Sequence, residues 1–96
     1  MYTLKLIDNK FTPEEAKEVL LTLINDKIKF HSTKNFSSEI RTGLSQEHSR
    51  QRIKELEEAK KEIIALIRKA EDVNILLDVE SSIHISGNPV EKKYQI

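Results

Sequence analysis

The sequence predicts an α+β fold dominated by two helices, which pack as an antiparallel hairpin and carry one strand region at each end of the chain. Apolar residues recur at spacings of three and four over residues 13–31 and 45–71, which is the period of a helix with one buried face. They alternate with polar residues over 2–7 and 73–86, which is the period of a strand. Charged residues make up 33% of the chain, a fraction typical of solvated helices around a thin core.

Composition limits the function classes that the chain can belong to. Its sixteen basic and sixteen acidic residues cancel, so no overall field selects nucleic acid or an anionic membrane. With no cysteine, disulfides, thiolate metal sites and cysteine nucleophiles are excluded. No run approaches the roughly 20 apolar residues of a membrane span, and the first residues do not resemble a signal peptide. We expect a cytoplasmic protein without a membrane partner, with residues 1–87 as one small domain and 88–96 as a tail.

The first strand and the first helix have clear local signals. Tyr2, Leu4 and Leu6 alternate with polar residues and predict a strand over 2–7. Thr12 and Glu15 have the spacing of a capping box, in which each side chain bonds the backbone amide of the other residue. A helix is therefore predicted to begin at residue 13 and to end near residue 31.

The second helix and the last strand region follow from a change of period. A stripe of apolar residues predicts a helix over 45–71 capped by Ser45, and Ile64 and Leu66 flank this stripe, so a further surface must cover them. From Val73 onward the period becomes two, which predicts one strand or two over 73–86. The absence of glycine and asparagine at residues 80–82 favours one continuous strand over a tight hairpin.

Two strands form only a marginal sheet in water, so the predicted sheet must be covered by the helices or extended by a second copy of the chain. A symmetric dimer would also cover the wide apolar face of the second helix. The alternative is a monomer whose strands fold back over the same hairpin. We expect a homo-oligomer, with the dimer as the preferred state.

The order of these segments resembles that of a group of small uncharacterised bacterial proteins with a strand, a helical hairpin and a terminal strand. The similarity rests on the segments "LKLIDNKFTPEEAKEVLLTLINDKIKFH", "KNFSSEIR" and "RIKELEEAKKEI", and its least generic part is "KIKFHSTKNFSS". The resemblance implies the same architecture and implies no activity.

Residues 27–43 are predicted to form a long connector between the two helices. Loops longer than about 12 residues in compact domains are often functional or ordered by their own side chains. We expect Phe30, Phe36 and Ile40 to anchor this connector and to hold the cations outward.

Positive charge is concentrated around the same connector. Seven cations against two acids lie between residues 27 and 54, namely Lys27, Lys29, Lys34, Arg41, Arg50, Arg52 and Lys54 against Glu39 and Glu47. The candidate partner-binding residues are Lys29, Lys34, Arg41, Arg50 and Arg52. A protein partner is the preferred interpretation, and nucleic acid, with Phe30 and Phe36 stacking on bases, is the alternative.

No motif in the sequence predicts a reaction. His31, His48 and His84 fall in three different predicted elements without metal-ligand spacing, and His31 is expected at a helix C-terminus, where the helix dipole favours an imidazolium. We therefore expect no catalytic residue, metal or cofactor. The sequence predicts a non-enzymatic, self-associating interaction or regulatory module that presents residues 27–54 to a macromolecular partner.

Overall fold

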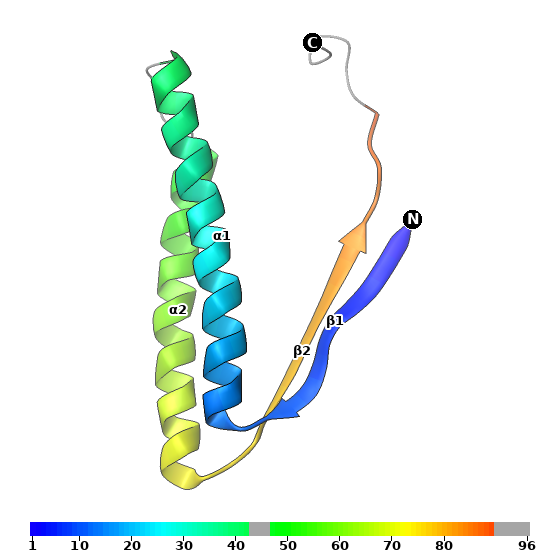
Figure 1. Ribbon diagram of the computed structural model, residues 1–96, viewed down its shortest axis with the longest axis vertical. Coiled ribbons are helices and arrows are strands. Elements are labelled where there is room, and N and C mark those ends of the chain that lie inside the picture. The colour runs from blue at the N-terminus through cyan, green and yellow to red at the C-terminus, as the bar shows by residue number, and fades with distance from the viewer. Residues whose placement is uncertain (43–46, 90–96) are drawn as a thin grey trace.

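The computed structural model describes residues 1–42 and 47–89. These residues form strand β1 (Tyr2–Phe11), helix α1 (Pro13–Thr42), helix α2 (Glu47–Val73) and strand β2 (Leu77–Ile85), in that order along the chain. The predicted α+β class and the strand, helix, helix, strand order are confirmed (Figure 1).

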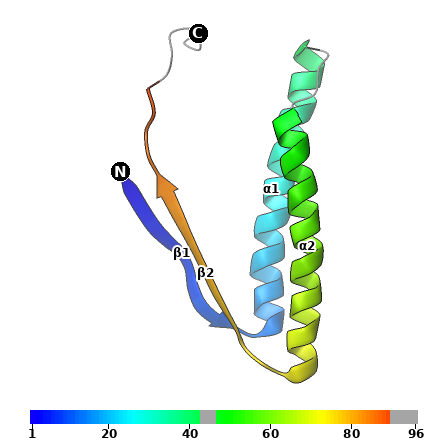
Figure 2. The same cartoon turned by 180° about the vertical axis from the view of Figure 1, so that it is seen from behind.

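The two helices lie antiparallel to each other, and the two strands pair into an antiparallel sheet beside them. Both strands join the hairpin at the same end, and the sheet diverges from the helices toward the chain termini (Figures 1 and 2). The molecule is accordingly long and thin, with extents of 54 × 33 × 15 Å.

The first helix begins as the capping box predicts. The Thr12 amide donates to Oε1 of Glu15 over 2.9 Å, and the Glu15 amide donates to Oγ1 of Thr12 over 3.1 Å. The Ala16 amide donates to the Thr12 carbonyl over 2.9 Å, which starts the helical bonding pattern. The amides of Glu15 and Ala16 are thus both hydrogen-bonded to Thr12, the first to its side chain and the second to its backbone carbonyl.

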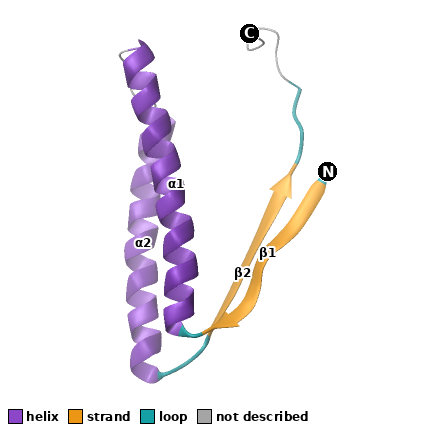
Figure 3. Cartoon of the chain, in the orientation of Figure 1, coloured by secondary structure: helices purple, strands orange, loops and turns teal. Residues whose placement is uncertain are grey.

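Helix α1 is longer than predicted, and the predicted connector over 27–43 is wrong. The helix continues to Thr42, so residues 27–42 are helical rather than a loop (Figure 3). Between Pro13 and Thr42 the sequence contains no glycine and no further proline, so nothing in this segment stops a helix. The next glycine is Gly43, which lies outside the described residues together with the predicted cap Ser45.

Helix α2 ends at Val73, and the predicted start of the last strand at that residue is wrong. Asn74 adopts a left-handed backbone with φ of 55°. The Asn74 amide donates to the carbonyl of Glu71 over 3.3 Å, and the Ile75 amide donates to the carbonyl of Ala70 over 3.2 Å. This pair of bonds is a Schellman motif, in which a left-handed residue closes the helix and satisfies its last carbonyls.

The sheet has one polar and one apolar face. Strand β2 is continuous, as expected, and β1 extends to Phe11, beyond the predicted end at residue 7. A bulge between Lys5 and Ile7 leaves Leu6 without a partner, so Ile7 lies opposite Ser81 and shares a face with Leu4. One face therefore carries Tyr2, Leu4, Ile7, Asn9, Phe11, Leu77, Val79, Ser81, Ile83 and Ile85.

The buried core is small. Ile7, Ala16, Ile67 and Ala70 are the buried apolar residues among those described. They belong to the middle of β1, the start of α1 and the end of α2, so the core occupies the end of the hairpin that carries the sheet. Residues 90–96 of the predicted tail lie outside the described residues.

The Asn74 cap gives a test of the helix end. Asn74→Ala is expected to lower the free energy of unfolding by about 1 kcal/mol, because a Cβ without a local hydrogen-bonding group is disfavoured in the left-handed region. Asn74→Gly is the matched control and should preserve or raise stability, because glycine adopts this backbone freely. Urea unfolding followed by circular dichroism measures both, and equal stability of the two variants would contradict the motif.

The helical state of residues 27–42 is tested by a proline at the exposed Ser32. Ser32→Pro is expected to cost about 3 kcal/mol, because proline removes an intrahelical hydrogen bond and clashes with the preceding turn. Ser32→Ala is the control and should be neutral or stabilising. If the proline variant unfolds at the same urea concentration as the parent, these residues do not need to be helical.

Candidate interaction surface

The apolar face of the sheet is directed toward the hairpin, and the divergence of the two layers leaves much of it open. In β2, Leu77, Val79 and Ser81 are half-buried, whereas their even-numbered neighbours are exposed. Contacts between the sheet and α1 are few and lie near the shared end. The sheet's polar face carries Lys5, Lys10 and Asp78, among others.

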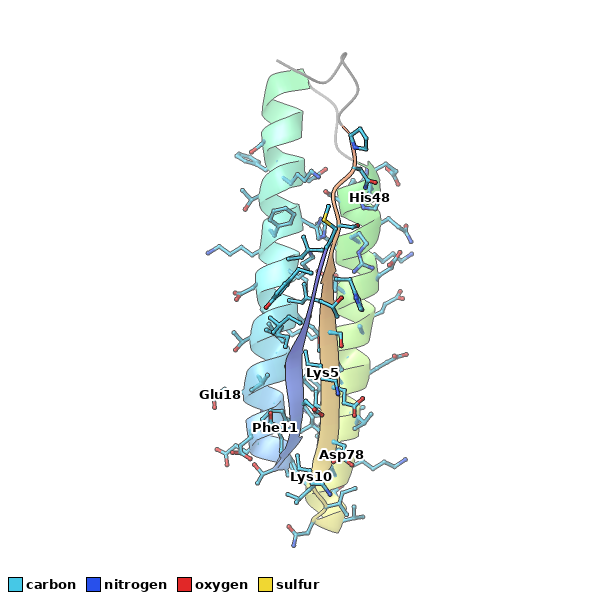
Figure 4. All side chains as sticks on the ribbon, turned by 90° about the vertical axis from the view of Figure 1, so that its right-hand side faces the viewer. Lys5, Lys10, Phe11, Glu18, His48 and Asp78 are labelled. Atoms are coloured by element: carbon cyan, nitrogen blue, oxygen red, sulfur yellow. The ribbon has the colours of Figure 1, made fainter. Side chains whose placement is uncertain are left out.

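Two apolar grooves run along the junction of sheet and hairpin. One lies on the α2 side, where Leu20, Ile63, Leu66 and Ile67 meet Leu77 and Val79. The other lies on the α1 side, where Leu6 and Ile7 meet Val19, Thr22 and Leu23. Figure 4 shows the same arrangement, with β1 in front of the α1 side and β2 in front of the α2 side.

Large apolar side chains in these grooves and on the surface beyond them face solvent. Tyr2 is 60% exposed on the sheet, and Leu66 is 56% exposed on α2. Phe30, two helical turns beyond Leu23 on the same face of α1, is 55% exposed. We call the following set the open inner face: Tyr2, Leu4, Ile83 and Ile85 of the sheet, with Leu23, Phe30 and Leu66 of the hairpin.

The predicted anchoring role of the phenylalanines is wrong. Phe30 and Phe36 project from an exposed side of α1 and are 55% and 62% exposed, so they hold no loop in place. Lys27 Nζ lies 5.1 Å from the centre of the Phe30 ring, an i, i+3 cation–π contact within the helix. The side chain of Ile40 lies outside the described part of the chain.

The candidate basic residues are divided between the two helices. Lys29 and Lys34 are exposed on α1, while the side chain of Arg41 is not among those described. Arg50 lies 3.8 Å from the carboxylate of Glu47, and Arg52 donates to Glu55 over 2.6 Å. The hydrogen bond from Arg52 lowers the pKa of Glu55 below its ordinary value, so this carboxylate stays ionised beside the arginine.

The structure brings together two polar side chains that the sequence left apart. His31 is only 6% exposed, and its Nδ1 lies 3.4 Å from the hydroxyl of Ser49, which is fully buried on α2. The ring of His48 lies 6.4 Å from that of His31, centre to centre. The pair occupies positions in the interface between the two helices where apolar residues would be expected. His31 follows Ile28 of α1 by three residues, and Ser49 precedes Ile53 of α2 by four, so each continues the apolar stripe of its helix. This continuation of both stripes is the sequence signal that would have revealed the pair.

The expected role of His31 as an imidazolium at a helix C-terminus is wrong. The residue lies inside α1, eleven positions before its end at Thr42. Burial lowers the pKa of His31, and the charges of Lys27, Arg52, His48 and Lys34 lower it further. Its Nε2 has no hydrogen-bond partner within the described residues. These features stabilise a neutral imidazole inside the helical seam.

The described residues contain no group of three or more His, Cys, Asp or Glu side chains arranged to hold a metal ion. Within the same residues, neither helix combines the length and the apolar character needed to cross a membrane. Comparison with protein-family models, with curated proteins and with solved structures gave no match.

The buried His31 predicts that acid destabilises the hairpin. A pKa that is lower in the folded state than its unfolded value of 6.5 means that the unfolded chain binds more protons, so stability falls as the pH drops through 6.5 toward the folded value. His31→Leu should reduce this loss. His48→Leu is the control and should retain most of it, because burial is the largest cause of the lowered pKa of His31 and the charge of His48 is a smaller one. Thermal unfolding between about pH 7.5 and about pH 5.5 spans the titration of an ordinary histidine. Equal pH dependence in the parent and His31→Leu would show that His31 is not responsible.

Proposed function

We propose that the chain is a non-enzymatic interaction module that self-associates, with a second copy of the chain covering the open inner face. The observation that carries this proposal is the uncovered apolar surface between sheet and hairpin, formed by residues such as Tyr2, Phe30 and Leu66. Exposed apolar patches of this kind mark surfaces that bind another molecule.

The exposed area supports a partner of the size of this chain. The whole chain exposes 8076 Å², whereas a compact protein of 11.1 kDa exposes about 5,700 Å². One subunit of an obligate homodimer buries about 1,000 to 2,500 Å². A chain with this much exposed surface has enough area to form an interface of that size.

The shape of the chain gives a second argument. Its radius of gyration is 17.4 Å, compared with about 12 to 13 Å for a compact domain of the same length. A two-stranded sheet that diverges from its helices lacks the cover that makes such a sheet stable in water. Association with a second copy would supply both strand partners and apolar cover.

Self-association would present two copies of the far end of the hairpin. Lys29, Lys34 and Arg50 are exposed toward this end, away from the sheet junction. We propose that these cations, with Arg41 and Arg52, contact a macromolecular partner, preferably an acidic protein surface. Because the dimer fixes the separation of the two copies, it would favour a partner with two matching sites.

Nucleic acid is a less favoured partner for these cations than an acidic protein surface. Arg50 and Arg52 already lie against Glu47 and Glu55 of their own helix, which reduces the positive charge available to any anionic partner. Nucleic acid is affected more than a protein surface, because its binding depends mainly on phosphate contacts. Phe36 is exposed and could stack on a base, but stacking without a basic groove along the strand gives weak binding. Salt-sensitive retention on an RNA or DNA matrix, lost on Lys34→Glu, would favour this alternative.

The self-association proposal is tested on adjacent residues of β1. Leu4→Glu places a charge on the open inner face and should weaken the dimer at least about tenfold, because a buried unpaired carboxylate is strongly disfavoured. Lys5→Glu is the matched control: it introduces the same charge one residue away, on the polar face of β1, and should leave association unchanged. Sedimentation velocity over a range of protein concentrations measures both dissociation constants.

A parent chain that sediments as a monomer at about 200 µM would overturn the proposal, because a dimer with an ordinary hydrophobic interface forms well below that concentration. Equal weakening by Leu4→Glu and Lys5→Glu would place the interface elsewhere and would also contradict it.

A further inference from the structure

The two edges of the sheet differ in how they are protected against pairing. Strand β1 carries the bulge at Leu6 and two lysines, Lys5 and Lys10, which are devices that prevent edge-to-edge association. Strand β2 contains no lysine, proline, glycine or bulge over its nine residues. Its free edge lies on the α2 side of the molecule, away from β1 (Figure 4).

The sequence of β2 is chemically symmetric about Ser81. An antiparallel pair of β2 strands related by a two-fold axis at Ser81 would place residues of matching type opposite each other. The pairs would be Leu77 with Ile85, Asp78 with His84, Val79 with Ile83, and Glu80 with Ser82. Apolar residues would meet apolar residues on the inner face, and the acid Asp78 would meet a histidine on the polar face.

We propose that β2 is the dimer edge, paired with β2 of a second copy about a two-fold axis at Ser81; this inference rests on the proposed self-association and specifies its geometry. The sheet becomes four-stranded, in the order β1, β2, β2, β1.

Neighbouring registers that keep the apolar faces together are poorer. An axis at Glu80 places the two Glu80 carboxylates opposite each other, and like charges in that position are destabilising. An axis at Ser82 leaves Leu77 without a partner in β2 and places Ser81 opposite Ile83. The axis at Ser81 alone pairs all nine residues of β2 with one another.

The polar pair is already oriented within one chain. Oγ1 of Thr3 lies 3.2 Å from Nδ1 of His84, its partner across the strands. When the Thr3 hydroxyl donates to Nδ1, the ring proton resides on Nε2, which remains to donate to the carboxylate of Asp78 in the second copy. In this tautomer His84 bonds Thr3 of its own chain and Asp78 of the second copy at the same time.

The register also covers the β2 side of the open end of the sheet. Ile85, which is 58% exposed, would lie beside Leu77 of the second copy, at the end where that copy's own hairpin meets its sheet. Because the axis is perpendicular to the sheet, both hairpins lie on the apolar face and the two α2 helices become neighbours. Leu66 of each copy, on the β2 side of α2, would then be directed toward the other copy.

Disulfide trapping tests the register, and the chain has no cysteine to interfere. In the proposed dimer the two Ser81 positions are directly opposite, within the Cα separation of about 4.4 to 6.8 Å that a disulfide requires. Ser81→Cys should therefore crosslink the parent dimer under mild oxidation at least about ten times faster than Ser82→Cys, whose two copies are offset along the strands beyond about 7 Å. Non-reducing gel electrophoresis measures both rates.

A mixed experiment checks the ends of the strands. Asp78→Cys in one tagged copy and His84→Cys in an untagged copy should give a heterodimeric band, whereas each variant alone should give none. A chain that sediments as a dimer but crosslinks equally at Ser81→Cys and Ser82→Cys would overturn this pairing and leave the proposed self-association intact. A monomeric chain would overturn both.

Discussion

The short connections at one end of the hairpin determine the rest of the structure. A single residue, Thr12, joins β1 to α1, and residues 74–76 join α2 to β2. Both strands therefore leave the helices at the same end, and they can pack on the hairpin only there. The buried apolar residues Ile7, Ala16, Ile67 and Ala70 belong to the elements around this junction. Farther along, sheet and helices separate, and their apolar faces remain open to a partner.

The helical seam changes character along its length. Near the sheet it is apolar, with Ile67 and Ala70 buried, whereas toward the far end it contains the buried polar pair of His31 and Ser49. A neutral histidine with one weak hydrogen bond contributes less to stability than an isoleucine would, because its second nitrogen remains unsatisfied. The same part of the hairpin carries the exposed cations Lys29 and Lys34.

The bulge at Leu6 has two consequences for the sheet. It restores the alternation of β1, so that Leu4 and Ile7 share the apolar face although they are three residues apart. It also interrupts the free edge of β1, while the edge of β2 stays regular. One extra residue thus produces an amphipathic sheet and makes its two edges unequal, which are the two features that the proposed association requires.

Local patterns in the sequence were enough to predict the element order and the capping box at Thr12, and they favoured one strand over two in the last region, because each of these features depends on neighbours in the chain. The sequence pattern did not show where α1 ends: beyond His31, residues 32–42 are mostly polar, and the helix continues through them because no residue stops it. The turn at Asn74 could not be predicted from the sequence, because Val73 and Ile75 are apolar and extend the alternating pattern of the strand back into the end of the helix. The pairing of His31 with Ser49, the strand register and the open inner face depend on contacts between residues far apart in the chain, which only the tertiary structure decides.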